Sequence, residues 1–137
     1  MADAVTSQTI VDTEKRVVMK FTNLSDGNGE AAVKKVDVSA LTAHPDGTAC
    51  SQVTIAQIWY DVGGLRLAIY FDASTSALAL TVGGSAAAGN MGGHMAFRSF
   101  GGIKNNASSP TGDIDFTTSG HTNLDHYTVI LEMRKQY

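Results

Sequence analysis

The sequence predicts an all-β protein: a single-domain antiparallel β-sandwich, jelly-roll-like, with about eight or nine short strands. Apolar and polar residues alternate with a period of two in many segments, which is typical of half-buried strands. Turn-forming residues recur at intervals of about ten residues. No segment carries apolar residues at helical spacing over three turns. The alternation by itself fits an immunoglobulin-like strand order as well as a jelly roll.

The length supports one domain. The chain has 137 residues and a mass of 14.4 kDa, with 14 glycines and only 2 prolines. A chain of this size can bury a substantial core without disulfides, and glycine-rich sequences favour tight turns. We therefore expect a single β-sandwich domain over residues 1–137, in which residues 1–10 form an extended N-terminal arm.

Alternation locates the strands. The patterned segments are 17–21, 33–38, 53–62, 65–71, 78–82, 95–97, 114–116 and 126–134, and a first strand precedes residue 13. The segments 53–62, 65–71 and 126–134 alternate most regularly, so each is expected to bury one face only. In the first of them one face holds Val53, Ile55, Gln57 and Trp59, and the other holds Thr54, Ala56, Ile58 and Tyr60.

Turn signals separate these strands. They are Thr13–Lys15, Asp26–Gly29, His44–Gly47, Asp61–Gly64 and Phe71–Ser76. The fourth lies at hairpin distance between two strong strands. A short helix is expected at most near residues 39–43 or 85–88. Residues 83–93 and 101–112 lack a core pattern, and their length and small side chains predict functional loops that contact other subunits.

Composition excludes several classes of protein. The net charge is -3 and the sequence pI is about 5.7, which argues against nucleic-acid binding. Cys50 is the single cysteine, so an internal disulfide is impossible, and we interpret it as a small buried hydrophobe. No apolar run reaches the roughly 20 residues that span a bilayer, so we expect no membrane partner. The first residues lack a signal-peptide pattern, which predicts synthesis in the cytoplasm without secretion.

No catalytic or metal-binding constellation stands out. His121 and His126 flank Asp125, but their spacing matches no zinc signature, so we interpret them as polar loop residues. The acidic segment 26–30 is expected to be a bare turn, since it lacks the rest of a calcium loop. We interpret Asp113 and Asp115 as a solvated strand face. The sequence predicts no enzyme, no cofactor and no metal, because no nucleophile, base and orienting group can be placed together.

Aromatic and arginine residues suggest a protein interface, since Trp, Tyr and Arg are enriched at interaction hot spots. We expect Trp59 to pack in the core, because single tryptophans often anchor such sandwiches. Tyr60 and Arg98, on the opposite faces of their strands, are then the better interface candidates. The full set of predicted interface residues is Tyr60, Met91, Arg98, Phe100, Ile103, Asn105 and Asn106.

Seven segments, in order, make the chain resemble small virion structural proteins of tailed bacteriophages. They are Ala4–Ile10, Val18–Gly27, Val36–Leu41, Ile58–Asp61, Phe97–Asn106, Thr111–Thr118 and Tyr127–Lys135. The resemblance implies a virion component, most simply a capsid decoration (cement) protein that binds and stabilises the assembled shell. It implies the major capsid protein or other virion proteins as partners, and self-association, with a homotrimer favoured.

Two other functions remain open at this point. A tail, baseplate or head–tail connector component also suits a small β-sandwich, and ring symmetry would distinguish it from a trimeric or monomeric cement protein. A carbohydrate- or calcium-dependent adhesion module is the other alternative, since β-sandwiches often carry such sites in their loops. Its candidate residues are Asp26, Asn28, Glu30, Asp113 and Asp115.

Overall fold

The computed structural model describes residues 4–26, 29–83, 90–119 and 123–137. Within these residues the chain forms nine strands, which confirms the predicted β-sandwich. They are β1 (Ala4–Asp12), β2 (Arg16–Asp26), β3 (Val33–Val36), β4 (Gln52–Gly63), β5 (Arg66–Thr75), β6 (Ala77–Gly83), β7 (Asn90–Ala96), β8 (Ser108–Ser119) and β9 (Asn123–Gln136). Two short 3-10 helices, η1 (Val38–Ala40) and η3 (Arg98–Phe100), complete the described elements.

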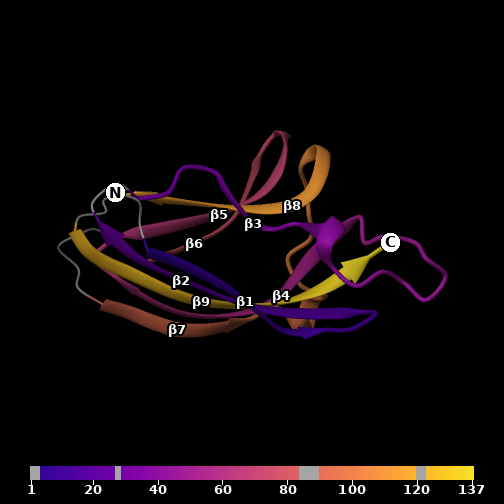
Figure 1. Ribbon diagram of the computed structural model, residues 1–137, viewed down its shortest axis with the longest axis horizontal. Helices are drawn as coiled ribbons and strands as arrows, with labels where there is room; N and C mark the ends of the chain where they lie inside the picture. The colour runs from indigo at the N-terminus through magenta and orange to yellow at the C-terminus, as the bar shows by residue number, and fades with distance from the viewer. Residues whose placement is uncertain (1–3, 27–28, 84–89, 120–122) are drawn as a thin grey trace.

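The strands form two stacked sheets, which Figure 1 shows as a lower and an upper layer. The five-stranded sheet has the order β1-β2-β9-β4-β7, and the four-stranded sheet has the order β3-β8-β5-β6. The antiparallel pairs are nested along the chain, so that each pair encloses the next one in sequence. From the outermost to the innermost they are β2 with β9, β3 with β8, β4 with β7, and β5 with β6. This nesting is the strand order of a jelly roll, with β1 added at one edge.

β1 replaces the arm expected over residues 1–10. From Ala4 onward the segment pairs antiparallel with β2, through a hairpin in which the Thr13 amide donates to the Arg16 carbonyl over 2.8 Å. The predicted turn at Thr13–Lys15 is thus confirmed. β1 is the outermost strand of its sheet, so one row of its backbone hydrogen-bonding groups faces no neighbouring strand among the described residues.

The core lies between the sheets and is built from the inward positions of the alternating segments. Phe116 on β8 meets Phe21 on β2 and Tyr127 on β9 edge-to-face, with ring centroids 5.1 and 5.8 Å apart. Such aromatic pairs contribute about 0.5–1.5 kcal/mol beyond the area they bury. Because these rings come from both sheets, they fix how the two layers stack.

The prediction that Trp59 packs in the core is wrong. A register shift in β4 between Ile55 and Gln57 makes Ala56 a bulge, which inserts one residue and exchanges the faces of everything that follows. Ile55 therefore faces the core before the bulge, and Ile58 faces it afterwards. Trp59 is 37% exposed on the outer side of the sheet. A strict alternation that is continued past the bulge therefore assigns the following residues, Trp59 included, to the wrong face of the sheet.

Other local predictions also change. The segment Asp61–Gly64 is no hairpin, since β4 and β5 belong to different sheets and the chain crosses between layers there. The expected break at Phe71–Ser76 lies largely inside β5, which continues to Thr75. Arg98, expected on a strand, lies in η3. The turn at His44–Gly47 is confirmed by a 2.8 Å backbone bond from the Gly47 amide to the His44 carbonyl.

The two predicted long loops are shorter than expected. β7 begins at Asn90 and β8 at Ser108, so each loop prediction overlaps a strand; residues 84–89 lie outside the described part. η1 confirms the helical turn expected near residue 39, whereas the alternative position at 85–88 is not described.

Close backbone approach explains two of the loop glycines. Gly112, at φ +92°, leaves no room for a side chain, since a Cβ there would lie 1.9 Å from the Ser51 carbonyl oxygen. Gly102, at φ +91°, also lies close to β4, with the Ile55 carbonyl oxygen 2.8 Å from the position of a Cβ. We expected small residues here to admit a neighbouring subunit, but at these two positions the neighbour is the same chain.

Candidate functional site

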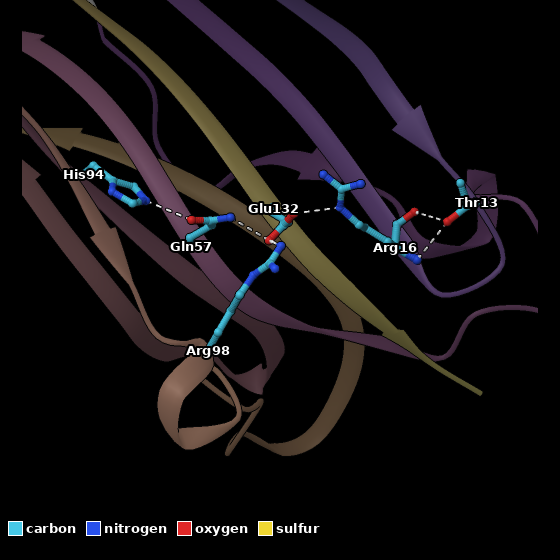
Figure 2. Close-up of polar contacts among 6 residues, drawn as sticks. All are labelled: Thr13, Arg16, Gln57, His94, Arg98 and Glu132. Carbon is cyan, nitrogen blue, oxygen red and sulfur yellow. Dashed lines mark hydrogen bonds and ion pairs between the residues drawn. The ribbon is translucent and has the colours of Figure 1, made fainter.

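A buried carboxylate organises the outer face of the five-stranded sheet. Glu132 lies in the middle of β9, the central strand, and its side chain is only 1% exposed although it points away from the core. Figure 2 shows the groups that cover it: Arg16 from one side, Arg98 from another and Gln57 from the neighbouring strand. Burying a carboxylate is costly unless it is paired and hydrogen-bonded, and here both conditions are met.

Each arginine reaches Glu132 from a rigid element. Arg16 opens β2 directly after the first hairpin, and its Nε donates to Oε2 of Glu132 over 2.6 Å. Arg98 lies in η3, and its guanidinium donates to Oε1 of the same carboxylate. Two backbone bonds hold the η3 segment against β4: the Phe97 amide donates to the Ala56 carbonyl over 2.8 Å, and the Ile103 amide donates to the Ile55 carbonyl over 2.8 Å. The bulge in β4 is therefore also the anchor of the Arg98 segment.

The charge of Glu132 is stabilised by its partners. Burial alone would raise the pKa of this carboxyl group, but the hydrogen bonds from Arg98, Gln57 and Arg16 and the Arg98 charge outweigh it and lower the pKa. Glu132 is thus ionised at neutral pH and holds both guanidinium groups in defined positions.

The polar chain continues to an exposed aromatic pair. Gln57 donates to Oε1 of Glu132 over 2.8 Å, and its own amide oxygen lies 2.8 Å from Nε2 of His94 on β7. The His94 ring stacks on Trp59, with centroids 4.9 Å apart and planes inclined by 13°. The aromatic stack is thus linked through Gln57 and Glu132 to the guanidinium groups of Arg16 and Arg98.

The predicted interface residues differ in how far they are exposed. Arg98 and Phe100 share η3 and are exposed, the latter to 66%, and Asn106 is exposed on the following loop. The other predicted residues with described side chains, Tyr60, Ile103 and Asn105, are partly buried, and the first two pack against the core. Met91 pairs with Val62 through the backbone of β7, and its side chain is not described.

The acidic candidates serve local structure instead of one shared site. Glu30 is buried and paired with Lys35, and it accepts a 2.8 Å bond from Nδ2 of Asn23. Asp113 accepts the Val38 amide over 2.9 Å and pairs with Lys34 over 2.9 Å. Across residues 4–26, 29–83, 90–119 and 123–137, no three His, Cys, Asp or Glu side chains are placed to hold a metal ion.

Asp115 is not the solvated residue that the sequence predicted. Its exposure is only 6%, although it lies on the outer face of the four-stranded sheet. Burial, together with the hydrogen bond to Asp72 and the negative charges of Asp72 and Asp113, raises its pKa to about 6. The two aspartates Asp72 and Asp115 thus form a carboxyl pair that retains a proton more readily than a free carboxyl group.

The remaining cysteine and histidine candidates lie among residues that stabilise the fold, where the structure describes them. Cys50 is buried as predicted, and burial raises the pKa of its thiol. Near it Lys135 is fully buried, pairs with Asp12 and donates to the Thr42 carbonyl over 2.9 Å. His44 lies 3.0 Å from Asp46 at the predicted turn. His121 falls outside the described residues.

Sequence reasoning missed the centre of this site. Alternation along residues 126–134 predicts only that Glu132 lies on the polar side of its strand, and nothing in that pattern shows that two arginines 116 and 34 residues away cover it. One signal lies in β9 itself, where Glu132 interrupts a run of apolar residues. In a central strand such a carboxylate is buried and requires hydrogen-bonding or charged partners.

Comparisons of the chain with protein-family models, with curated proteins and with solved structures give no match. Among the described residues the structure contains no helix with the length and apolar character to cross a membrane. The function is therefore argued from the site itself.

Proposed function

We propose that this chain is a non-enzymatic virion structural protein, a capsid decoration protein that binds an assembled shell through the outer face of its five-stranded sheet. The proposal rests on the resemblance to small virion proteins of tailed bacteriophages and on the character of that face. One observation carries it: Arg98 and Trp59, residue types that dominate protein interfaces, are both exposed and are linked to each other through Glu132, Gln57 and His94.

Rigidity matters because ordering side chains opposes binding. Immobilising one flexible side chain at an interface costs about 0.5–1.5 kcal/mol. The Arg98 guanidinium is held by Glu132, and the Trp59 ring stacks on His94. Both side chains are therefore already ordered before a partner binds, and less conformational entropy is lost on binding. Such preorganisation suits a protein that adds to a repeated lattice in many copies.

The edge strand β1 supports self-association, with a homotrimer as the expected form. Its residues 5–10 are all exposed, and no charged residue or proline occurs from Ala4 to Val11. Native edge strands usually carry such residues to prevent pairing with another chain. A charge-free edge fits a strand that pairs with a neighbouring copy, and a head-to-tail contact of this kind can close into a ring of three.

Shell binding is tested with phage particles isolated from the source culture. The purified protein is added, the particles are sedimented and the bound fraction is measured. Trp59→Ala and Arg98→Ala are expected to weaken binding at least about tenfold. Leu78→Ala is the matched control, because Leu78 is 53% exposed on the other sheet and its loss is expected to change nothing. Failure of the unaltered protein to sediment with particles contradicts the proposal.

Trp59 also provides a direct optical signal. It is the one tryptophan in the sequence, so any change in tryptophan emission reports on the outer face alone. Burial of this face against a shell protein is expected to shift the emission to shorter wavelength. Binding without a spectral shift would place the contact on another surface.

A further inference from the structure

Positive charge gathers at one end of the five-stranded sheet. Six of the ten lysine and arginine residues line three adjoining hollows, all of which include Arg134: the six are Lys15, Arg16, Arg98, Lys104, Arg134 and Lys135. The carboxylates that line these hollows or pair with their lysines are Asp12, Glu14 and Glu132. This end therefore carries an excess of positive charge in a chain whose net charge is -3.

The hollow over Glu132 is the most enclosed of the three. It measures about 380 Å³ and is lined by Lys15, Arg16, Arg98, Glu132 and Arg134. Glu132 occupies its inner side and is shielded from water, while the side chains of Arg16 and Arg98 remain 51% and 58% exposed. A single buried carboxylate thus holds two half-exposed guanidinium groups at the rim of one hollow.

These guanidinium groups have binding capacity left. A guanidinium has five N–H donors. In the described part of the chain, Arg16 uses its side chain in one ion pair, to Glu132, and Arg98 likewise in one. Arg134 makes no side-chain ion pair among the described residues, although it lies directly opposite Arg16 in the β2–β9 ladder. The remaining donors are available to a ligand that enters the hollow.

We propose that this hollow is a binding site for a small oxyanion with two or more negative charges, of the phosphate or polycarboxylate class. Arg16, Arg98 and Arg134 would provide its hydrogen bonds, and Lys15 a further charge. Arginine forks match the paired oxygens of phosphate and carboxylate groups. Glu132 is a positioning residue, which orients the two arginines without touching the ligand. This hollow shares Arg98 and Glu132 with the proposed shell-binding face, but the inference does not rest on shell binding and is tested through Arg134.

The charge distribution favours a small anion over a polymer. Outside this cluster the sequence holds ten acidic residues and four basic ones. A nucleic acid or an anionic membrane would extend beyond the hollow and meet this negative surface, whereas a compact anion meets only the cations that line it.

Titration calorimetry with sodium phosphate and with sodium citrate, at low ionic strength and matched sodium concentration, tests the site. Saturable binding with a dissociation constant on the order of 1 mM or below is expected for at least one of the two anions. Arg134→Gln is expected to weaken it at least about tenfold, and loss of this exposed, unpaired residue leaves the Glu132 cluster intact. Arg66→Gln, which removes an exposed cation at the start of β5, is the matched control and is expected to have no effect.

Three results would overturn the inference. They are the absence of saturable heat with both anions, equal weakening by the Arg134 and Arg66 substitutions, and tighter binding of a DNA duplex that depends on Arg134. The first result would mean that the hollow binds neither anion. The second would mean that the anions respond only to the net charge of the protein. The third would mean that the surface binds a nucleic acid instead of a small anion. Shell binding is tested separately, by sedimentation with particles and by the emission of Trp59, so each of these results leaves that proposal standing.

Discussion

Arg98 in η3 and Glu132 in the middle of β9 form an ion pair that ties the segment after β7 to the central strand of the five-stranded sheet. The pair joins residues 34 positions apart and crosses over β4, whose Gln57 donates to the same carboxylate. Arg16 completes the arrangement from the other side (Figure 2). Three elements, β2, β4 and η3, thus each bring one side chain to Glu132 on β9.

The first prediction concerns the contribution of Glu132 to stability. Glu132→Gln keeps the shape of the side chain but leaves Arg16 and Arg98 without their counter-charge. The free energy of unfolding is expected to fall by roughly 1–2 kcal/mol, because two charge-assisted hydrogen bonds are weakened while the half-exposed guanidinium groups remain accessible to water. Urea unfolding followed by circular dichroism measures it. Arg134→Gln, at an exposed position, is the control and is expected to change stability by less than about 0.5 kcal/mol.

The same residue predicts a response to acid. The pKa of Glu132 is lower in the folded protein than its ordinary value of 4.5, so its stabilising contribution is complete above that value. It is lost as the pH falls through the lower folded pKa. Wild-type protein should lose stability below about pH 4.5 more steeply than Glu132→Gln. Parallel curves for the two proteins would show that Glu132 is not held in its ionised form.

Asp115 predicts the opposite dependence on pH. Its folded pKa of about 6 lies above the ordinary 3.8, so between these values the folded state binds a proton that the unfolded chain has lost. The free energy of unfolding therefore decreases as the pH rises through this window. Asp115→Asn should remove this decrease and stabilise the protein at pH 7 by roughly 1–3 kcal/mol, with little change at pH 4. Thermal unfolding at both pH values measures the difference, and an equal effect at the two would contradict the raised pKa.

Gly112 and Gly47 form a matched pair for testing close packing. Both have positive φ angles, +92° and +91°, but a Cβ at Gly112 meets the Ser51 carbonyl oxygen, whereas nothing lies within 4 Å of one at Gly47. Gly47→Ala should cost roughly 1 kcal/mol for its backbone conformation alone. Gly112→Ala should cost roughly 3 kcal/mol or more, since the β8 strand must move away. Equal costs would mean that the contact with Ser51 is easily relaxed.

The open edge of β1 predicts how copies associate. Light scattering after size-exclusion chromatography is expected to give three times the 14.4 kDa mass of the chain. Ser7→Lys, at an exposed position of the edge strand, should lower the measured mass to that of the monomer. Pairing β1 with a strand of another copy would bury the new lysine charge, which opposes association. Ala43→Lys, exposed on the loop after η1, is the control for added charge. A monomeric wild-type protein, or an unchanged trimer for Ser7→Lys, would exclude β1 as the contact.

Local periodicity was sufficient for the fold class because it reflects a local property. Successive strand residues point to opposite faces, so residues such as Val129, Leu131 and Met133 indicate a one-sided strand wherever that strand lies. Turn-forming residues likewise identified the turn at His44–Gly47, and the usual burial of a free cysteine was the basis for placing Cys50 in the interior. It failed at Trp59, because one inserted residue in β4 exchanges the faces and only pairing with β9 shows the insertion.

The sequence by itself determined an all-β chain of alternating strands, an apolar core and the absence of a recognisable catalytic motif. Tertiary structure decided the nested strand order, the placement of Trp59 and His94 on the outer face, and the convergence of Arg16 and Arg98 on Glu132. The physical reason is that strand periodicity acts between neighbours in the chain. Pairing of sheets, burial of a carboxylate and clustering of charge depend on residues far apart in sequence, which only the folded arrangement brings together.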